Sequence, residues 1–445
     1  MKSNKIQPGV AVLGCGTVGG ATAKLLFTEE KYLQKKTNTD ICLKYIVDLD
    51  FSHAKELGLE ESLFETDFEK ALSDPEVGVV VELVGGTGIA KTFIEKALNA
   101  GKHVVTANKA LLAEHGIELF RLARKNHVSI AFEASCAGGI PIIRALCDGL
   151  SANSVHALYG IVNGTCNYIL TAMDQRGESY ENVLREAQES GLAEADPTLD
   201  VSGMDSAHKL TIMSSLAYSS RIGLDTIPVH GIDSLNLSDV EYGKELGYVI
   251  KLLAVAQKQK NGVSLRVRPA FISKEHPLAW VSGAFNAVSV YSSAVGHTMY
   301  YGRGAGGSPT ASAVASDILS LCTGSWQRIF DSLTIWPDLT EKANQLPPSD
   351  IESRFYIRMT VQDSPGMLAK ISKVFGDHGI SLSSVLQKEI SEEQTGMTTA
   401  SIVITTHAAI EGNMKKALSE IDAMPGVTEH SICISIVEED IEFPG

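Results

Sequence analysis

Short apolar runs alternate with segments of helical periodicity over the first 135 residues. The apolar runs cover residues 9–13, 41–47, 78–83, 103–106 and 129–132, and a helical pattern starts at Thr17. Alternation of this kind is typical of a parallel sheet whose strands are joined by crossover helices. We therefore expect an α/β domain with a doubly wound parallel sheet over residues 1–137.

The pattern becomes less regular from residue 138 onwards. Long amphipathic helices are expected at 180–190, 205–218 and 246–258, and a strand is expected at 262–271. These features favour a second domain of α+β type over residues 138–304. Residues 305–340 are expected to return and complete the first domain.

A third, small domain is expected at the carboxyl end. Gln345-Leu346-Pro347-Pro348 marks a linker over residues 341–352. Residues 353–438 show the order β-α-β-β-α-β, which is typical of a ferredoxin-like module. The expected strands are 354–362, 380–389, 398–405 and 431–437, and the expected helices are 367–377 and 410–424. Leu368, Ile371 and Phe375 share one apolar face of the first of these helices.

The composition indicates a globular protein with an acidic surface. Of the 445 residues, 44% are hydrophobic and 20% are charged, which excludes fibrous and disordered proteins. The formal net charge is -15, and residues 350–445, with 15 acidic and 7 basic side chains, hold more than half of it. This balance argues against nucleic acid or an anionic membrane as a partner, although a local phosphate-binding pocket remains open.

Nothing in the chain indicates export or insertion into a membrane. The short apolar run after Met1–Lys5 ends at Leu13 and is interrupted by glycine, and no later segment reaches about 18 apolar residues. The seven cysteines are scattered and never form a CxxC pair, so neither a disulfide framework nor a zinc cluster is indicated. We expect a reducing, cytoplasmic location.

A glycine motif follows the first expected strand and opens the first helix: Gly14-Cys15-Gly16-Thr17-Val18-Gly19. In this setting the glycines close a tight turn, let backbone N–H groups approach a pyrophosphate and let the helix pack on the strand. The motif indicates a Rossmann-type domain that binds a dinucleotide. A tight turn with a purely structural role is the alternative.

Asp48, at the end of the second expected strand, is the candidate acid for the adenine ribose. It lies 29 residues after Gly19 because a polar insertion, 31–40, follows the first helix. A carboxylate at this position favours NAD over NADP. Nearby basic side chains keep NADP open: Lys44, His53 and Lys55.

Two later segments are candidates for ligand contacts. Thr106 ends the expected strand 103–106 and Lys109 follows it, and polar groups at the carboxyl ends of parallel strands line the crevice in which ligands bind. For Lys109, a solvated surface lysine is the alternative. Residues 301–310 form a glycine-rich loop before a helix at 311–321, which is either a second anion or cofactor contact or a flexible connector.

The segment Glu133–Pro141 combines a carboxylate with small residues and a Gly-Gly bend. Such a segment can fold its carbonyl groups around a hard cation, with Glu133 supplying charge. A thiolate nucleophile at Cys136 is an alternative, but no histidine or helix start nearby would activate it. A packed cysteine without chemistry is the third interpretation.

The densest cluster of acidic residues lies in Gly191–Lys209. Asp205 and Lys209 are spaced i and i+4, so they share one face of the helix that begins there. Because this helix is apolar, we expect the pair to be partly buried. A partly buried lysine beside carboxylates has a pKa that suits proton transfer. A helix-capping acid with a surface ion pair is the alternative.

Together these segments resemble homoserine dehydrogenase, an oxidoreductase of aspartate-derived amino-acid metabolism, followed by an ACT module. The resemblance covers essentially the whole chain, and its most specific segments are 106–109, 133–141, 163–170 and 191–209. The arginine that the family often carries near the end of the second strand is absent around residues 48–50, which weakens the case for NADP.

The resemblance implies a role for each candidate residue. Lys209 would be the proton donor and acceptor, with Asp205 and Glu194 beside it in the catalytic group. The substrate would be bound by Glu194, Asp200, Asp205 and Lys109. The dinucleotide would be bound by Gly14, Gly16, Thr17, Val18, Gly19, Asp48, Thr106, Lys109, Gly191 and Gly302. A structural sodium ion would be bound by Glu133 and the carbonyl groups of Cys136, Gly138 and Ile140.

The implied reaction is the reversible NAD(P)-dependent interconversion of L-homoserine and L-aspartate 4-semialdehyde, in threonine, methionine and isoleucine biosynthesis. Asp363, Pro365 and Gly366 would form the ligand loop of the ACT module, which implies feedback regulation by L-threonine. Family members are homodimers or homotetramers. Two alternatives remain: a phosphorylating aspartate-semialdehyde-type dehydrogenase that uses Cys136, and a Rossmann-plus-ACT amino-acid sensor without turnover.

Overall fold

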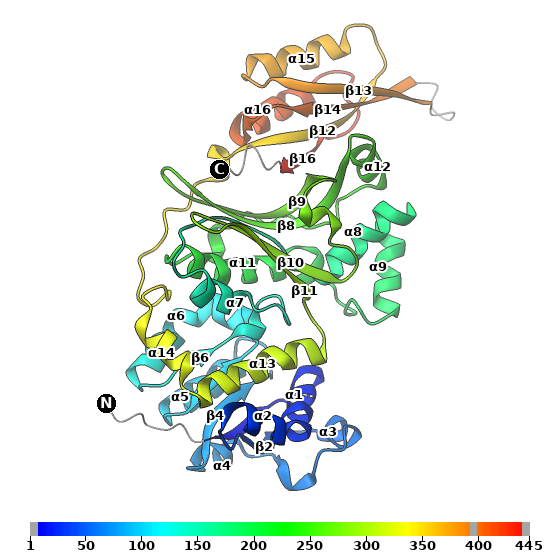
Figure 1. Ribbon diagram of the computed structural model, residues 1–445. Helices are drawn as coiled ribbons and strands as arrows, with labels where there is room; N and C mark the ends of the chain where they lie inside the picture. Colours follow the sequence, from blue (N-terminus) through cyan, green and yellow to red (C-terminus); the bar gives the residue numbers. More distant parts are fainter. Residues whose placement is uncertain (1–7, 392–397, 438–445) are drawn as a thin grey trace. The chain divides into compact units, whose positions relative to one another are not determined.

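The computed structural model describes residues 8–391 and 398–437, which form two compact units (Figure 1). The first unit runs to Gly164 and adds Met204–Ile227 and Ala284–Ala343; the second comprises Thr165–Gly203, Pro228–Gly283 and the described residues from Asn344. Met1–Lys5 and residue 438, the expected end of the ACT module, lie outside the described residues. Within the described ranges, no helix combines the length and hydropathy needed to span a bilayer.

A six-stranded parallel sheet forms the centre of the first unit, in the order β3-β2-β1-β4-β5-β6. Its strands are β1 (Gly9–Leu13), β2 (Cys42–Val47), β3 (Phe64–Glu65), β4 (Val77–Glu82), β5 (His103–Thr106) and β6 (Ile130–Ala131). All residues of β1, β4 and β5 are buried, which explains their nearly continuous apolar sequence. The predicted doubly wound sheet is therefore confirmed.

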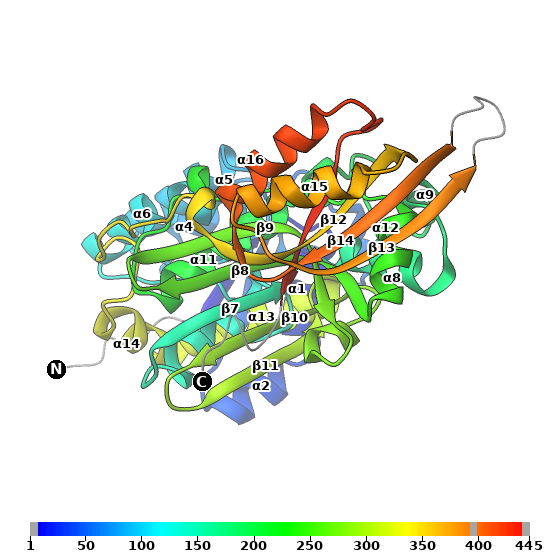
Figure 2. The same ribbon diagram turned by 90° about the horizontal axis from the view of Figure 1, so that it is seen from above.

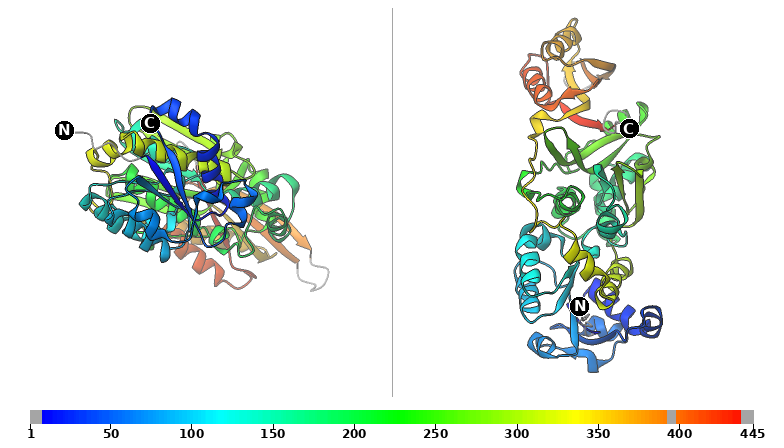
Figure 3. Two further views of the ribbon diagram at one scale, coloured as in Figure 1. Left: turned by 90° about the horizontal axis from the view of Figure 1, so that it is seen from below. Right: turned by 60° about the vertical axis from the view of Figure 1, so that its left-hand side comes forward.

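Helices cover both faces of this sheet (Figure 3). They are α1 (Thr17–Thr28), α2 (Glu30–Thr37), α3 (Ser52–Glu56), α4 (Phe68–Ser73), α5 (Ile89–Asn99), α6 (Lys109–Lys125), α13 (Gly307–Cys322) and α14 (Ser325–Ser332). The polar insertion after α1 forms α2, whose only buried residue is Leu33. The late helix α13 packs against α1, although nearly 300 residues separate them in sequence.

The rest of the first unit contains three antiparallel strands and two helices. Strand β10 lies between β7 and β11 and is antiparallel to both. The elements are α7 (Ile142–Arg144), β7 (Val155–Ile161), α11 (Met204–Ala217), β10 (Phe285–Ser292) and β11 (Gly296–Arg303). Helix α11 is buried along nearly its whole length and contacts α6, which brings two segments with candidate residues together.

The second unit is built around the hairpin of β8 (Tyr248–Gln259) and β9 (Gly262–Ser273). The helix predicted at 246–258 is therefore wrong. Residues 250–257 are all buried, so the strand lacks the polar alternation that identifies a half-exposed strand. A continuous apolar run cannot be told from a buried helix by periodicity alone. The helices of this unit are α8 (Gly164–Arg176), α9 (Tyr180–Glu189), α10 (Thr198–Val201) and α12 (Leu237–Glu245).

The end of the chain has the predicted β-α-β-β-α-β order, with one additional two-residue strand, β15, before the second helix. Its elements are β12 (Glu352–Gln362), α15 (Met367–Asp377), β13 (Leu382–Ser391), β14 (Thr398–Thr406), β15 (Ala409–Ile410), α16 (Glu411–Asp422) and β16 (Ile432–Val437). Figure 2 shows α15 and α16 on one face of the strands. Ile371 and Phe375 are in the core as expected, but Leu368 is 36% exposed, and Met367 and Val374 are buried instead.

Strand β16 connects the module to the β8–β9 hairpin, because it pairs with β12 on one side and with β9 on the other. The pairing with β9 is parallel and joins Ser435 to Ala270. A buried ion pair adds a second connection. The carboxylate of Asp239, in α12, accepts hydrogen bonds from Arg358 Nε at 2.6 Å and Nη2 at 3.0 Å and from the Tyr356 hydroxyl at 3.0 Å.

Buried His103 is expected to make the first unit acid-sensitive. Burial lowers the pKa of His103 to about 4, below the ordinary 6.5 of the unfolded chain. The stability contributed by its neutral form is therefore present above pH 6.5 and is lost as the pH falls towards 4, by up to about 3 kcal/mol. We expect His103→Gln to lose less unfolding free energy than the parent between pH 7 and pH 4.5 in urea titrations. The exposed His156→Gln is the control; a profile for His103→Gln that parallels the parent would contradict this.

Candidate active site

The turn between β1 and α1 has the geometry that the glycine motif predicted. Gly14 has φ +86°, a conformation that favours glycine. A Cβ on Gly19 would lie 1.9 Å from the Gly14 carbonyl oxygen, so only glycine lets α1 pack this closely on β1. A Cβ on Gly16 would have no neighbour within 4 Å. This open space beside the helix start is where a pyrophosphate can approach the backbone.

The start of α13 lies beside this turn. A Cβ on Gly307 would be 3.1 Å from the carbonyl oxygen of Thr17. Neither α1 nor α13 has a side chain that caps its first N–H groups. Two uncapped helix N-termini therefore create a local positive potential suited to a dinucleotide phosphate. Gly302, at the end of β11, lies next to Ile140, since a Cβ there would be 3.2 Å from that side chain.

Asp48 follows β2 directly and turns its carboxylate to the glycine motif. It accepts hydrogen bonds from the backbone N–H groups of Cys15 and, at 2.7 Å, of Leu49. The predicted ribose acid is thus next to the predicted pyrophosphate turn. Among the nearby bases, Lys44 forms an ion pair with Glu76, and Lys55 lies 3.0 Å from Glu61.

Thr106 ends β5 and is fully buried. Its hydroxyl donates to Glu82 Oε2 at 2.7 Å, and Glu82 Oε1 accepts the backbone N–H groups of Val84 and Gly85 at 2.9 and 3.0 Å. These bonds fix the ends of β4 and β5. Asn108 then caps α6 by accepting the N–H of Leu111, which places Lys109 in the first turn of that helix.

One carboxylate joins the two candidate lysines. Asp205 Oδ1 lies 2.9 Å from Lys109 Nζ, and Asp205 Oδ2 lies 2.7 Å from Lys209 Nζ. Asp205 is 3% exposed and Lys209 is 9% exposed, so the pair is largely screened from water. The spacing of Asp205 and Lys209 predicted their contact. It did not predict Lys109, which reaches Asp205 from another helix.

Further hydrogen bonds hold this cluster in place. The Asn163 side-chain amide donates to Asp205 Oδ2 at 2.9 Å, and Lys209 Nζ donates to the Val162 carbonyl oxygen at 2.6 Å. Burial alone would raise the pKa of Asp205, but the charges of Lys209 and Lys109 outweigh it and keep the pKa far below its ordinary value. Asp205 is therefore a fixed anion that orients two ammonium groups. Sequence reasoning missed the role of Asn163, whose only signal was its place just before α8.

Cys136 lies near the cluster but is inert. Its Sγ is 3.9 Å from the Lys209 carbonyl oxygen, and its side chain is fully buried. Burial raises the pKa of the thiol to about 12, so the thiolate needed for nucleophilic attack is absent near neutral pH. The packed cysteine was the correct interpretation.

Glu133 belongs to a buried network. Its two carboxylate oxygens accept the backbone N–H groups of Ile143 at 2.8 Å and Arg144 at 2.9 Å, while Arg144 also bonds to Asp317 at 2.7 Å. Burial and the charge of Asp317 raise the pKa of Glu133 to about 8. Both side-chain oxygens of Glu133 therefore have hydrogen-bond donors within the protein. No group of three or more His, Cys, Asp or Glu side chains in the described ranges is placed to hold a metal ion.

The remaining candidates belong to the second unit. Gly191, with φ +72°, follows α9, and Glu194 is exposed in the next loop. Asp200 lies in α10, where Thr165 Oγ1 donates to its Oδ2 at 3.2 Å. Pro365 and Gly366 are exposed between β12 and α15, as is a third residue of that loop, Asp363.

Known proteins match the chain along its length. Family models match residues 14–133 (homoserine dehydrogenase, NAD-binding domain), 141–319 (homoserine dehydrogenase) and 355–426 (ACT domain). A homoserine dehydrogenase from Neisseria gonorrhoeae is 42% identical over 418 residues, which cover 93% of this chain and 95% of that protein. The chain belongs to the homoserine dehydrogenase family.

Solved homoserine dehydrogenases share the fold. The crystal structure of the Thiobacillus denitrificans protein has a TM-score of 0.90 and 38% identity, and the match covers 97% of this chain and 98% of that one. A hyperthermophilic archaeal homoserine dehydrogenase in complex with NADPH has a TM-score of 0.59 and 25% identity over 70% of this chain and 96% of its own. Like its relatives, the chain is an oxidoreductase that acts on a CH–OH group and has a nicotinamide-dinucleotide domain. The alternatives, a phosphorylating dehydrogenase and a sensor without turnover, are thereby set aside.

A substitution at Gly16, which borders open space, tests whether this turn binds the cofactor. We expect Gly16→Ala to keep the melting temperature of the parent within about 2 °C but to weaken binding of NADH and NADPH at least about tenfold, because its methyl group would occupy the approach to the helix start. Fluorescence titration and circular dichroism measure the two effects. Gly376→Ala, which also meets no neighbour within 4 Å, is the control. Unchanged affinity in Gly16→Ala would contradict the assignment.

Proposed function

We propose that the chain interconverts L-homoserine and L-aspartate 4-semialdehyde, with Lys209 as the proton donor and acceptor. The observation that carries this proposal is the buried cluster in which Asp205 and the Val162 carbonyl oxygen hold the Lys209 ammonium group. A lysine fixed in this way presents its remaining proton in one direction, as general acid catalysis requires.

The roles of the two lysines follow from the cluster. A bound nicotinamide supplies the hydride to the aldehyde carbon, or accepts it in reverse. Lys209 gives its proton to the aldehyde oxygen as the charge develops there, and in reverse takes the proton of the homoserine hydroxyl. Lys109 provides a second positive charge on the same carboxylate. We propose that Lys109 binds the cofactor and the substrate. Asp205 orients the ammonium groups of both lysines.

Substrate recognition is assigned to acids of the second unit. Glu194 binds the substrate ammonium group, and Asp200, in α10, supports it. The exposed carboxylate of Glu194 suits a cationic amino group. The fold of the glycine turn and Asp48 supports NAD as the preferred dinucleotide, because a carboxylate beside the turn accepts ribose hydroxyls and repels a 2′-phosphate.

One assay tests the activity and the cofactor together. Oxidation of NADH or NADPH is followed at 340 nm with aspartate semialdehyde in a phosphate-free buffer. We expect turnover without phosphate and a higher kcat/KM with NADH. A requirement for phosphate or the absence of turnover with both dinucleotides would overturn the proposed reaction, and equal or better use of NADPH would overturn the cofactor preference.

We further propose feedback inhibition by L-threonine through the loop that contains Asp363, Pro365 and Gly366. This loop lies between β12 and α15, and its residues are exposed for ligand binding. We expect Asp363→Ala to raise the threonine concentration for half-inhibition at least about fivefold without changing uninhibited turnover. Asp377→Ala, an exposed acid at the other end of α15, is the control. Unaltered threonine sensitivity in Asp363→Ala would contradict the assignment.

We propose in addition that the chain acts in threonine, methionine and isoleucine biosynthesis in the cytoplasm, as a homodimer or homotetramer. A pairing module of the ACT type favours association. We also propose a structural sodium ion bound by Glu133 and by the carbonyl groups of Cys136, Gly138 and Ile140, in the segment that follows β6.

A further inference from the structure

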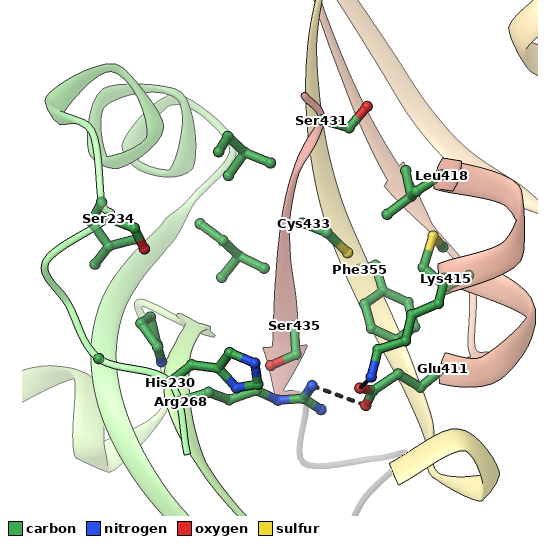
Figure 4. A pocket seen from close by; sticks show the side chains of 16 residues that line it. His230, Ser234, Arg268, Phe355, Glu411, Lys415, Leu418, Ser431, Cys433 and Ser435 are labelled. Atoms are coloured by element: carbon green, nitrogen blue, oxygen red, sulfur yellow. Dashed lines mark hydrogen bonds and ion pairs between the residues drawn. The ribbon is translucent and has the colours of Figure 1, made fainter. Parts of the chain in front are cut away.

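A cavity of about 260 Å³ lies in the second unit, over the place where β9 and β16 begin to pair. Pairing starts at Ser435 and Ala270, directly after Pro269, which has no N–H group to donate. The preceding residues of β16 line the cavity instead. One wall is the loop 230–235 and the other is α16 (Figure 4).

The floor of the cavity is cationic. Arg268 Nη1 lies 2.9 Å from Glu411 Oε2, and Lys415 Nζ lies 3.1 Å from Glu411 Oε1. Two positive groups therefore share one carboxylate. Burial and the charges of Arg268 and Lys415 lower the pKa of His230, which keeps this third basic side chain neutral near pH 7. The floor carries one uncompensated positive charge.

Polar atoms at the floor lack partners. Arg268 Nε and Nη2 are buried without a hydrogen bond, and so is the hydroxyl of Ser435. Arg268 and Ser435 both line the cavity, and Figure 4 shows them at the end where the ion pair of Arg268 with Glu411 lies. Buried cationic donors without an acceptor are costly, which indicates an anionic acceptor that is absent from the chain itself.

Another arginine of the second unit, Arg358, has a carboxylate as its acceptor. Arg358 binds the carboxylate of Asp239 through its Nε and Nη2 atoms, which form the two-donor edge of a guanidinium. The corresponding edge of Arg268 has no partner.

The other end of the cavity is apolar. Leu235, Phe355, Met414 and Leu418 line it. A cavity of about 150 Å³ holds benzene, so the present volume is enough for a molecule of roughly ten non-hydrogen atoms. We propose that this cavity binds a small monocarboxylate with a short apolar group, its carboxylate on Arg268 and Ser435 and its apolar group against α16.

This binding site is separate from the loop of Asp363 to which we assign threonine, and it does not rest on the proposed reaction. It is formed by β9, the loop 230–235 and three elements of the ACT module (β12, α16 and β16). The cationic floor and the apolar wall together define the class of ligand. An inorganic anion has no apolar group to contact the wall, and an alkylamine carries a positive charge that the cationic floor repels.

Calorimetric titration of the full chain tests the proposal with three probes: sodium 4-methylpentanoate, inorganic phosphate and 3-methylbutylamine. We expect saturable binding of the carboxylate, at least tenfold weaker binding of phosphate and none of the amine. Absence of saturable binding of the carboxylate, or equal binding of phosphate or the amine, would overturn the proposal.

Two variants locate the binding in the cavity. Arg268→Lys keeps the charge but loses the planar fork, and we expect at least tenfold weaker carboxylate binding. Cys433→Phe fills the cavity from β16 and should abolish binding if Arg268→Lys does not fold. Lys416→Gln, which removes a neighbouring exposed charge outside the cavity, is the control and should bind like the parent. Unchanged affinity in a folded Arg268→Lys or Cys433→Phe variant would refute the assignment.

Discussion

Replacing Lys209 by alanine is expected to lower kcat by about 10²-fold or more, with little change in cofactor affinity. The variant removes the proton donor while the glycine turn and Asp48 stay in place. Steady-state assays of the proposed reaction and fluorescence titration with NADH measure the two quantities. Asp205 keeps Lys109 and Asn163 as partners, so the buried carboxylate is not left unpaired.

A matched control separates catalysis from stability. Lys102 is as buried as Lys209, and its Nζ donates to the carbonyl oxygens of Asp74 at 2.8 Å and Val77 at 2.7 Å. Lys102→Ala should therefore lower the melting temperature but leave kcat near that of the parent. Turnover close to the parent value in Lys209→Ala would remove the role assigned to this lysine.

The second large effect is expected on stability, at Asp239. Asp239→Ala removes the fully buried carboxylate that pairs with the Arg358 guanidinium, whose side chain is 12% exposed, and loss of one partner of a buried ion pair costs about 3–5 kcal/mol. The unfolding free energy of the second unit, measured by urea denaturation, should fall by this amount. Asp377→Ala, which breaks an exposed i,i+4 pair with Lys373, should change it by less than about 0.5 kcal/mol. A loss of less than about 1 kcal/mol in Asp239→Ala would show that the pair is not a main support of the module.

The glycine turn and one contact of the candidate active site could be predicted from residues that are close together in sequence. The glycine motif is informative because each glycine has a different role within six residues: the structure shows steric demands at Gly14 and Gly19 and open space at Gly16. The contact of Asp205 with Lys209 follows from helical spacing alone. These features depend on neighbours in sequence, and for that reason they were visible in the pattern.

The rest depends on contacts between distant segments. Lys109 reaches Asp205 because α6 packs on α11, and no local pattern encodes that packing. Strand β8 was predicted as a helix because its burial on both faces removes the period of two. The cavity beside Arg268 was not predicted at all, since it exists only where β16 meets β9.

The parallel pairing of β16 with β9 has a consequence for biosynthesis of the protein. Ribosomes release the chain from its amino end, so β9 emerges about 160 residues before its partner strand. During that interval the edge of β9 has unpaired backbone groups, which makes it a site for wrong strand pairing. The edge of β9 therefore acquires its partner only after β16 has been synthesised. Chains that are truncated before β16 are consequently expected to aggregate.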